Sequence, residues 1–194
     1  QYNTDRREIE SGVLDAAMAQ AEQQASDESP LILVASEGWH PGVIGIVAGR
    51  IKETYNRPAC VVAIENSLGK GSGRSVPGVE LGPAVIAAHQ AGLLVNGGGH
   101  AMAAGFTVPE DKIADFRTFL SDHISRQLAG ERLAPDIGID GALSPEGATV
   151  ELIELLEGAG PFGAGNPRPR FVLPSVTPIN ARIVGTDHVS CFLA

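Results

Sequence analysis

The chain has few cysteines, no long apolar run and no dense group of metal-binding side chains. Cys60 and Cys191 are its two cysteines; they lie far apart, and neither belongs to a CxxC pair. A disulfide framework or a zinc site is therefore not expected, and a reducing cytoplasm is the default compartment. No apolar stretch approaches the roughly 18 to 20 residues that cross a bilayer, so we expect no transmembrane helix and no membrane partner.

Catalytic clusters are also missing. Phosphoester hydrolysis by two metal ions needs several Asp and His ligands close together. Here Asp122–His123 and Asp187–His188 are isolated pairs. No strand–turn–helix nucleophile elbow is apparent either. We therefore expect neither a metal site nor a catalytic residue within this sequence, although His100, considered below, is a candidate for an assisting role.

Size and composition indicate a globular protein. The 194 residues exceed the usual single-domain length of about 100 to 150, so one large or two small domains are expected. Hydrophobic residues make up 43% and charged residues 19%, with 24 glycines and 13 prolines, which is typical of a folded chain with many loops rather than a disordered one. Because Gln1 opens a charged segment with no initiator methionine, we expect a fragment of a longer chain.

The hydrophobic pattern alternates between helix and strand periods over the first two thirds of the chain. Apolar residues at intervals of four (Ile9, Val13, Ala17, Ala21) mark one face of a helix over 5–25. Further helices are expected over 41–55, 81–94 and 111–128, with strands over 31–35, 59–64, 72–76 and 103–108. This alternation predicts an α/β layer.

A different pattern follows a break at 130–135. Strands are expected over 137–143, 171–173, 176–184 and 189–193, with one short helix over 149–156. This second part is β-rich and ends inside an apolar run. It fits a small barrel whose last strands are missing.

The net charge of -9 argues against a nucleic-acid partner for the chain as a whole. Its distribution weakens that objection, because the acidic residues concentrate in the predicted helices. Two windows carry bases and no acids: 66–79, with Lys70 and Arg74, and 158–186, with three arginines. An anionic ligand would bind there, unless these loops lack acids by chance.

The segment Lys70-Gly71-Ser72-Gly73-Arg74-Ser75 combines glycines, hydroxyls and cations. Glycines allow backbone N–H groups to converge, and hydroxyls and an arginine fork bind phosphate oxygens. We predict phosphate binding by Lys70, Ser72, Gly73, Arg74 and Ser75. The alternative is a flexible hairpin with solvated charges. The spacing is neither that of a Walker A motif nor that of a dinucleotide fingerprint.

The glycine triplet Gly97-Gly98-Gly99 followed by His100 is the sharpest feature of the sequence. Three residues without side chains let a ligand approach the main chain, and the next residues could start a helix whose amide end attracts anions. His100 would then donate a hydrogen bond to a phosphoryl oxygen or a base edge and respond to pH. The alternative is a structural histidine.

Further candidates flank these two segments. Trp39 stacks on a base or belongs to the core, which we favour, and His40 contacts the ligand or caps the following helix. Phe162, Arg168 and Arg170 lie in a glycine- and proline-rich loop, where stacking and backbone attraction would hold a single strand. A rigid interdomain loop is an equal alternative for that segment.

Four motifs together resemble the C-terminal half of the RecJ family of single-stranded-DNA-specific exonucleases, which belongs to the DHH phosphoesterase superfamily. They are SEGWHPGVIGIVAGRI (36–51), GKGSGRSVPGVEL (69–81), GGGHAMAAGF (97–106) and GPFGAGNPRPRF (160–171). GGGH followed by AAG is similar to the substrate-binding domain of the wider superfamily, and the first and last motifs narrow the resemblance to RecJ.

The resemblance implies three parts: a helix over 1–28 that joins an absent catalytic DHH domain, a DHH-associated substrate-binding domain over 29–130, in which helices flank a mixed sheet, and a truncated OB-like barrel over 131–194. It also implies a bacterial, cytoplasmic DNA-repair and recombination enzyme that degrades single-stranded DNA from the 5′ end with Mn²⁺ or Mg²⁺. The metals would be bound by the absent domain, and Ser72, Arg74, Ser75 and His100 would hold the substrate's phosphate and terminal nucleotide. Repair proteins are further expected partners.

Two other functions stay open. A superfamily relative that acts on short oligonucleotides or cyclic dinucleotides would share the same motifs, but the β-rich part beyond 130 favours long strands. A noncatalytic nucleotide-binding or assembly module, whose acidic helices hold a protein partner, is the alternative of a different class.

Overall fold

The computed structural model describes all residues except 1, 26–28, 132, 134–137, 164–165 and 187. The expected break over 130–135 and Asp187 therefore fall wholly or partly outside the described residues. The chain divides into two compact units, Gln1–Pro135 and Asp136–Ala194. Each unit is described by itself below.

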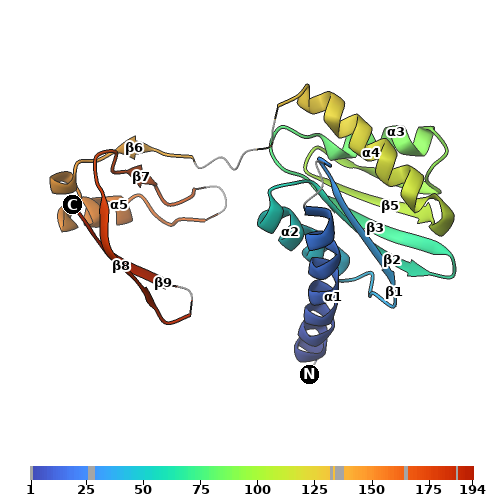
Figure 1. Cartoon of the computed structure of the whole chain (residues 1–194), viewed down its shortest axis with the longest axis horizontal. Coiled ribbons are helices and arrows are strands. Elements are labelled where there is room, and N and C mark those ends of the chain that lie inside the picture. The colour runs from blue at the N-terminus through green and yellow to red at the C-terminus, as the bar shows by residue number, and fades with distance from the viewer. Residues whose placement is uncertain (1, 26–28, 132, 134–137, 164–165, 187) are drawn as a thin grey trace. The chain divides into compact units, whose positions relative to one another are not determined.

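A five-stranded mixed sheet forms the centre of the first unit. Its strand order is β1-β2-β3-β5-β4, with β1 and β2 parallel and all other neighbours antiparallel. The strands are β1 Ile32–Glu37, β2 Ala59–Glu65, β3 Leu68–Arg74, β4 Asn96–His100 and β5 Ala103–Pro109. Helices cover both faces (Figure 1), which confirms the expected α/β fold with a mixed sheet flanked by helices.

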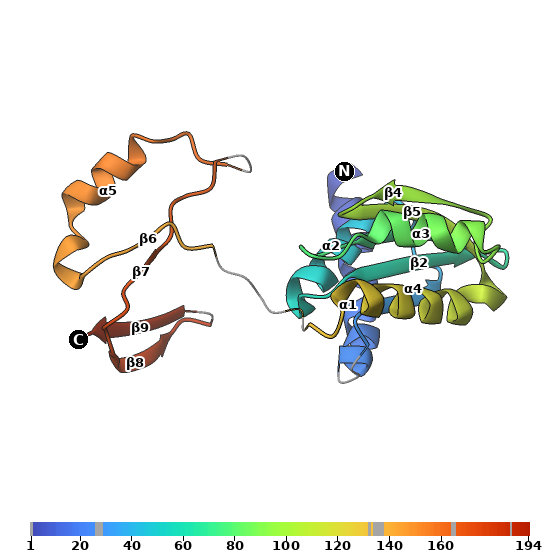
Figure 2. The same cartoon turned by 90° about the horizontal axis from the view of Figure 1, so that it is seen from above.

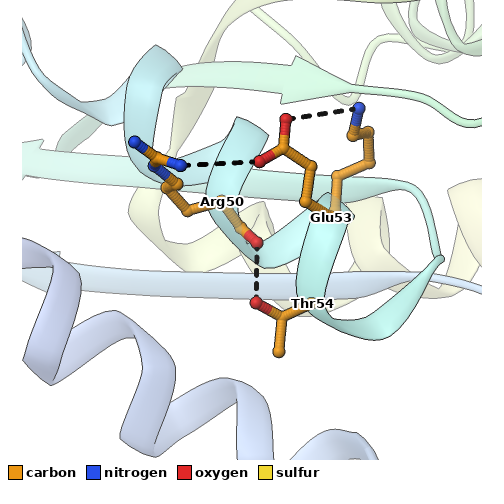
Figure 3. Close-up of polar contacts among 4 residues, drawn as sticks. Arg50, Glu53 and Thr54 are labelled. Carbon is orange, nitrogen blue, oxygen red and sulfur yellow. Dashed lines mark hydrogen bonds and ion pairs between the residues drawn. The ribbon is translucent and has the colours of Figure 1, made fainter. Parts of the chain in front are cut away.

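Helices α1 (Tyr2–Ala25) and α2 (Ile44–Tyr55) cover one face of the sheet. The interval-of-four stripe of α1 is confirmed in part, because Val13, Ala17 and Ala21 are buried in this layer. Trp39 joins the same core and is 9% exposed. On the outer side of α2, Arg50 pairs with Glu53, and the Thr54 hydroxyl donates to the Arg50 carbonyl (Figure 3).

Helices α3 (Leu81–Gln90) and α4 (Ile113–Leu128) cover the opposite face, and the 3₁₀ turn η1 (Glu110–Lys112) precedes α4. Phe116 of α4 is fully buried and meets Phe106 of β5 edge-on, with ring centroids 4.8 Å apart. Such aromatic pairs stabilise a core beyond the area that they bury. This contact fixes α4 against the centre of the sheet.

Two glutamines of α1 complete the β1 edge of the sheet. The side-chain amide of Gln24 donates to the Leu33 carbonyl at 2.8 Å and accepts from the Leu33 N–H at 3.1 Å. Gln20 forms the same pair of hydrogen bonds with Ala35, both at 3.2 Å. Unpaired edge strands invite pairing with other chains. The two amides act in place of a sixth strand and satisfy this edge from within the unit.

The segment predicted as a phosphate-binding loop is a strand, β3, at the centre of the sheet. Its glycines face the core, where a Cβ on Gly71 would lie 2.0 Å from the Phe106 ring and one on Gly73 would lie 2.6 Å from Leu81. The glycines of this segment are therefore required by packing across the sheet. Their expected role, convergence of backbone amides on a ligand, was wrong.

The helix expected after the glycine triplet was also wrong. The triplet lies in β4, Ala101 and Met102 form a turn, and the chain returns as β5. The turn is held by hydrogen bonds from the Ser75 N–H to the Met102 carbonyl and from the Leu81 N–H to the Ala101 carbonyl, both 2.9 Å. This hairpin places Gly98 and His100 on the sheet itself.

The second unit consists of short elements: β6 Gly141–Ala142, η2 Pro145–Gly147, α5 Val150–Glu157, β7 Phe171–Val172, β8 Pro178–Val184 and β9 His188–Leu193 (Figure 2). β6 pairs with β7 in parallel, and β8 pairs with β9 antiparallel. None of its described residues is buried. The described strands of this unit thus form two separate two-stranded sheets.

Within the described part of the chain, no helix has the length and apolar content needed to span a bilayer.

Candidate nucleic-acid site

Three cross-strand rows of residues line the face of the sheet that α1 and α2 leave uncovered at β5 and β4. Directly paired residues of antiparallel strands point to the same face. The register therefore aligns one row of polar residues, one row containing two glycines, and one row with a cation and an imidazole. The rows are Lys70–Thr107–Asn96, Ser72–Gly105–Gly98 and Arg74–Ala103–His100.

The middle row leaves open space above the sheet. A Cβ on Gly98 or Gly105 would meet nothing within 4 Å. The other two glycines of the triplet differ, because a Cβ on Gly97 would lie 2.8 Å from Leu94 and one on Gly99 would lie 2.3 Å from the Ala103 carbonyl oxygen. A ligand can thus approach the main chain at Gly98 and Gly105, whereas Gly97 and Gly99 serve packing.

Arg74 is oriented by its neighbours on β3. Its Nη1 donates to the Ser72 Oγ at 3.1 Å and to the Gly73 carbonyl at 2.9 Å. The guanidinium also lies against α2, since a Cβ on Gly45 would come within 3.0 Å of Nη2 and 3.2 Å of the Ser72 Oγ. Gly45 therefore makes the room that this arginine–serine pair needs.

A groove of about 450 Å³ lies beside this pair. Its lining combines the segment that leads into α2 with residues of β3, β4 and β5: Pro41, Gly42, Ile44, Gly45, Lys70, Gly71, Ser72, Asn96, Gly105, Phe106 and Thr107. No carboxylate is among them. The groove thus presents hydroxyl, amide and ammonium groups beside a guanidinium, which is a set that binds phosphate oxygens.

His100 lies at the end of β4, in the same cross-strand row as Arg74. It is exposed. Its main chain is held close to α3, because a Cβ on Gly82 would lie 2.6 Å from the His100 carbonyl oxygen. The register places His100 on the same face of the sheet as Arg74.

Ser75 differs from its neighbours in the motif. It is 1% exposed, and its Oγ donates to the Val79 carbonyl at 2.7 Å. That hydrogen bond closes the turn between β3 and α3. In this structure the hydroxyl is occupied within the fold and does not face the groove.

Trp39 and His40, in the segment that leads into α2, lie next to the groove. Trp39 belongs to the core, and the His40 Nδ1 accepts a hydrogen bond from the Gly42 N–H at 3.0 Å in the turn before the helix. Both also line a neighbouring hollow of about 600 Å³. A ligand in this hollow would contact only the exposed edges of Trp39 and His40.

Two of the candidates in the second unit, Phe162 and Arg168, contact each other. Arg168 pairs with Glu157, and its guanidinium lies 5.0 Å from the centre of the Phe162 ring. The hydrogen bond from Arg168 lowers the pKa of Glu157 below its ordinary value. Arg170 donates its backbone N–H to Asp140 at 2.8 Å. The Arg168 guanidinium thus already contacts Phe162 and the Glu157 carboxylate, and a phosphate that bound it would compete with Glu157.

The site contains functional candidates that the sequence pattern did not indicate. Thr107, Asn96, Gly105 and Gly45 lie in or beside the groove. All four stand far from the charged motif in sequence. Strand register brings Thr107, Asn96 and Gly105 to it, and α2 brings Gly45. Gly105 is the last residue of the AAG that follows GGGH, so this motif could have pointed to it.

No group of three or more His, Cys, Asp or Glu side chains that could hold a metal ion occurs among the residues that the structure describes. The polar side chains of the groove are cationic or neutral, whereas Mn²⁺ and Mg²⁺ prefer carboxylate ligands. The groove therefore does not fit a divalent metal ion.

Comparison with known families assigns both units. The DHHA1 domain matches residues 28–126. This chain belongs to the DHHA1 family. The RecJ OB domain matches residues 139–194, in the β-rich second unit. The resemblance to RecJ inferred from the motifs is confirmed.

Curated relatives and solved structures agree with this assignment. The single-stranded-DNA-specific exonuclease RecJ of Dickeya dadantii is 36% identical over 197 residues, covering 96% of this chain and 33% of the relative. The corresponding protein of Bacillus subtilis is 33% identical over 189 residues, 96% of this chain and 24% of its own length. The DHHA1 chain thus spans a third or less of these relatives.

The crystal structure of RecJ from Thermus thermophilus in complex with Mn²⁺ superposes with a TM-score of 0.79 at 31% identity, covering 98% of the DHHA1 chain and 28% of the RecJ chain. Its complex with Mg²⁺ gives a TM-score of 0.75 at 29% identity, covering 98% and 29%. Both units of the DHHA1 chain thus have counterparts in RecJ.

Proposed function

We propose that this chain is the substrate-binding portion of a metal-dependent exonuclease that degrades single-stranded DNA in the 5′ to 3′ direction during DNA repair and recombination. The groove beside Ser72 and Arg74 holds a backbone phosphate and the terminal nucleotide. A catalytic DHH domain elsewhere in the parent protein supplies the two metal ions and the chemistry. The parent acts in the bacterial cytoplasm.

The observation that carries this proposal is the arginine–serine pair beside the open middle row. The Ser72 Oγ holds one nitrogen of the Arg74 guanidinium, and Gly45 leaves room for the other. A guanidinium fixed in this way can donate to a phosphate oxygen, and the open backbone at Gly98 and Gly105 lets the nucleotide lie against the sheet. His100 stands at the end of the same surface and can donate to a second oxygen or to a base edge.

The division of labour follows from the donors present. A groove of cations and neutral donors orients a phosphodiester and stabilises its charge, but it cannot activate water through a divalent ion. Orientation of the reacting groups is itself a large part of phosphoryl-transfer catalysis. In the parent enzyme, the segment 1–28, which includes α1, would lead from the catalytic domain. Residues 29–130 would bind the end of the substrate, and residues 131–194 would extend binding along the DNA strand.

The test uses the parent protein that contains both the catalytic domain and this chain. Replacing Arg74 or His100 with alanine should lower the exonuclease rate on single-stranded DNA while thermal unfolding stays unchanged, because both side chains lie on the ligand face. Arg126→Ala is the control, since Arg126 is exposed on α4 and its Nε donates within its own helix. Full activity of both the Arg74 and the His100 variant would refute the proposal.

Binding by the chain alone separates the two other functions. A labelled single-stranded oligonucleotide at low salt should bind, and Arg74→Ala should weaken it. No binding at high protein concentration would favour an assembly role. Tighter binding of a cyclic dinucleotide than of the oligonucleotide would favour a short substrate.

A further inference from the structure

The phosphate groove continues along β3 into a second hollow of about 600 Å³. Lys70, Thr107 and Pro41 line both spaces. Beyond them the second hollow is lined mainly by apolar groups, including Trp39, Ile64 and Leu68. The two spaces therefore adjoin at Lys70, with phosphate-binding groups on one side and an apolar surface on the other.

Lys70 stands where a second phosphate would follow the first. It lies two residues from Ser72 on the same face of β3, about 7 Å along the strand. The Arg74 guanidinium is held at Ser72, so the two cations do not share one position. Lys70 is exposed, and no ion pair of its side chain is found among the described residues. Its ammonium, with Thr107 in the same row, is available to a phosphate one extended nucleotide away.

The apolar hollow suits the base that follows that phosphate. Leu68 is an apolar side chain at a strand end, yet it is 44% exposed. Glu65 and Asn66 lie at the rim and offer a carboxylate and an amide. A carboxylate repels a phosphate, but it accepts hydrogen bonds from the N–H groups of a base edge. The charges thus place the phosphate at Lys70 and the base toward Leu68.

We propose that this hollow is a second nucleotide subsite, in which Lys70 and Thr107 bind the next backbone phosphate and the Leu68 side of the hollow holds its base. The inference rests on the proposed function of the neighbouring groove. It makes recognition depend on ligand length, because a mononucleotide fills one subsite and a dinucleotide fills both.

The experiment measures affinities of the 194-residue chain by NMR titration at low salt for three ligands: 5′-phosphorylated thymidine, the 5′-phosphorylated thymidine dinucleotide, and the same dinucleotide lacking its second base. The dinucleotide should bind the wild type tighter than the mononucleotide. Loss of the second base should lower the affinity of the dinucleotide by about fivefold or more, which corresponds to the lower end of the free energy of one base contact, about 1 kcal/mol.

Lys70→Gln removes the charge and keeps most of the side-chain length. It should weaken the dinucleotide more strongly than the mononucleotide and reduce the salt slope of dinucleotide binding by about 0.7. Lys112→Gln is the matched control, because Lys112 lies in η1 and lines neither space. Leu68→Ser should weaken the full dinucleotide but not the one without its second base. Thermal unfolding of each variant shows whether the fold is kept.

Equal affinity of the wild type for mononucleotide and dinucleotide would overturn the subsite while leaving the proposed function intact. The same holds if Lys70→Gln weakens both ligands equally, because Lys70 would then belong to the first phosphate. If the wild type binds neither ligand, both the subsite and the proposed function fail.

Discussion

Gly45 offers a sharp test of the proposed site, because its missing side chain makes room for the ligand-binding pair rather than for the core. A methyl group there would lie 3.0 Å from the Arg74 Nη2 and 3.2 Å from the Ser72 Oγ. Both contacts are tighter than ordinary van der Waals distance, so the flexible guanidinium has to move by a few tenths of an ångström or more. Gly45→Ala should therefore disturb the arginine without damaging the fold.

The magnitudes separate binding from stability. Alanine is favoured over glycine within a helix by up to about 1 kcal/mol, so Gly45→Ala should leave the free energy of unfolding unchanged or raise it. A hydrogen bond to a charged group contributes about 1.5 to 3 kcal/mol. Losing one such bond to phosphate should lower the affinity for a 5′-phosphorylated mononucleotide roughly tenfold or more.

The matched control lies one turn further along the same helix. A Cβ on Gly49 would meet nothing within 4 Å, so Gly49→Ala should raise stability by up to about 1 kcal/mol and keep full affinity. Affinity is measured by titration with the mononucleotide, and stability by urea unfolding. If Gly45→Ala and Gly49→Ala bind the nucleotide equally well, the Arg74–Ser72 pair is not the phosphate site.

Three further predictions concern the fold. Gly71→Ala should destabilise the first unit by about 1 to 3 kcal/mol in urea unfolding, because its methyl would lie 2.0 Å from the Phe106 ring, and a wild-type midpoint would contradict that packing. Gln24→Leu should cost about 1 to 2 kcal/mol and raise the tendency to self-associate in sedimentation, since the β1 edge loses two hydrogen bonds; a monomer of unchanged stability would contradict it. Burial raises the pKa of the Cys60 thiol from 9.0 to about 12. Below pH 9 the thiol is protonated in both states and the free energy of unfolding keeps its full value. As the pH rises from 9 toward 12, the unfolded chain loses this proton first and the free energy of unfolding falls. Iodoacetamide should accordingly modify the exposed Cys191 in the native chain and Cys60 only after unfolding, and rapid native modification of Cys60 would refute its burial.

Elements with a clear hydrophobic period could be predicted from the sequence. The interval-of-four stripe marked α1, and the short apolar run 59–64 marked β2, because burial on one face or both imposes those patterns. β4 could not be found in this way. Its sequence Asn-Gly-Gly-Gly-His has no apolar side chain, and the strand exists because Gly97 and Gly99 fit closely against Leu94 and Ala104.

The candidate site could be predicted in part. The types of residue in the motifs pointed to phosphate, and strand register brings Ser72, Arg74 and His100 to one face of the sheet. The role of each glycine could not be read from the pattern, because that depends on which face of a strand it occupies. For the same reason Ser75, one residue past the strand, was expected at the ligand and lies buried in a turn.

The alternation along β3 has a consequence for how this protein can change. A Cβ at its odd-numbered positions, Gly69, Gly71 and Gly73, would meet core side chains, and its even-numbered positions, Lys70, Ser72 and Arg74, lie on the face of the sheet that carries the groove. The two faces of this short strand are thus under different structural constraints, packing at the odd-numbered positions and the proposed binding site at the even-numbered ones. If the proposed site binds the substrate, substitutions at Lys70, Ser72 and Arg74 change affinity and substrate length while the scaffold persists, whereas a side chain at Gly71 or Gly73 acts on folding first.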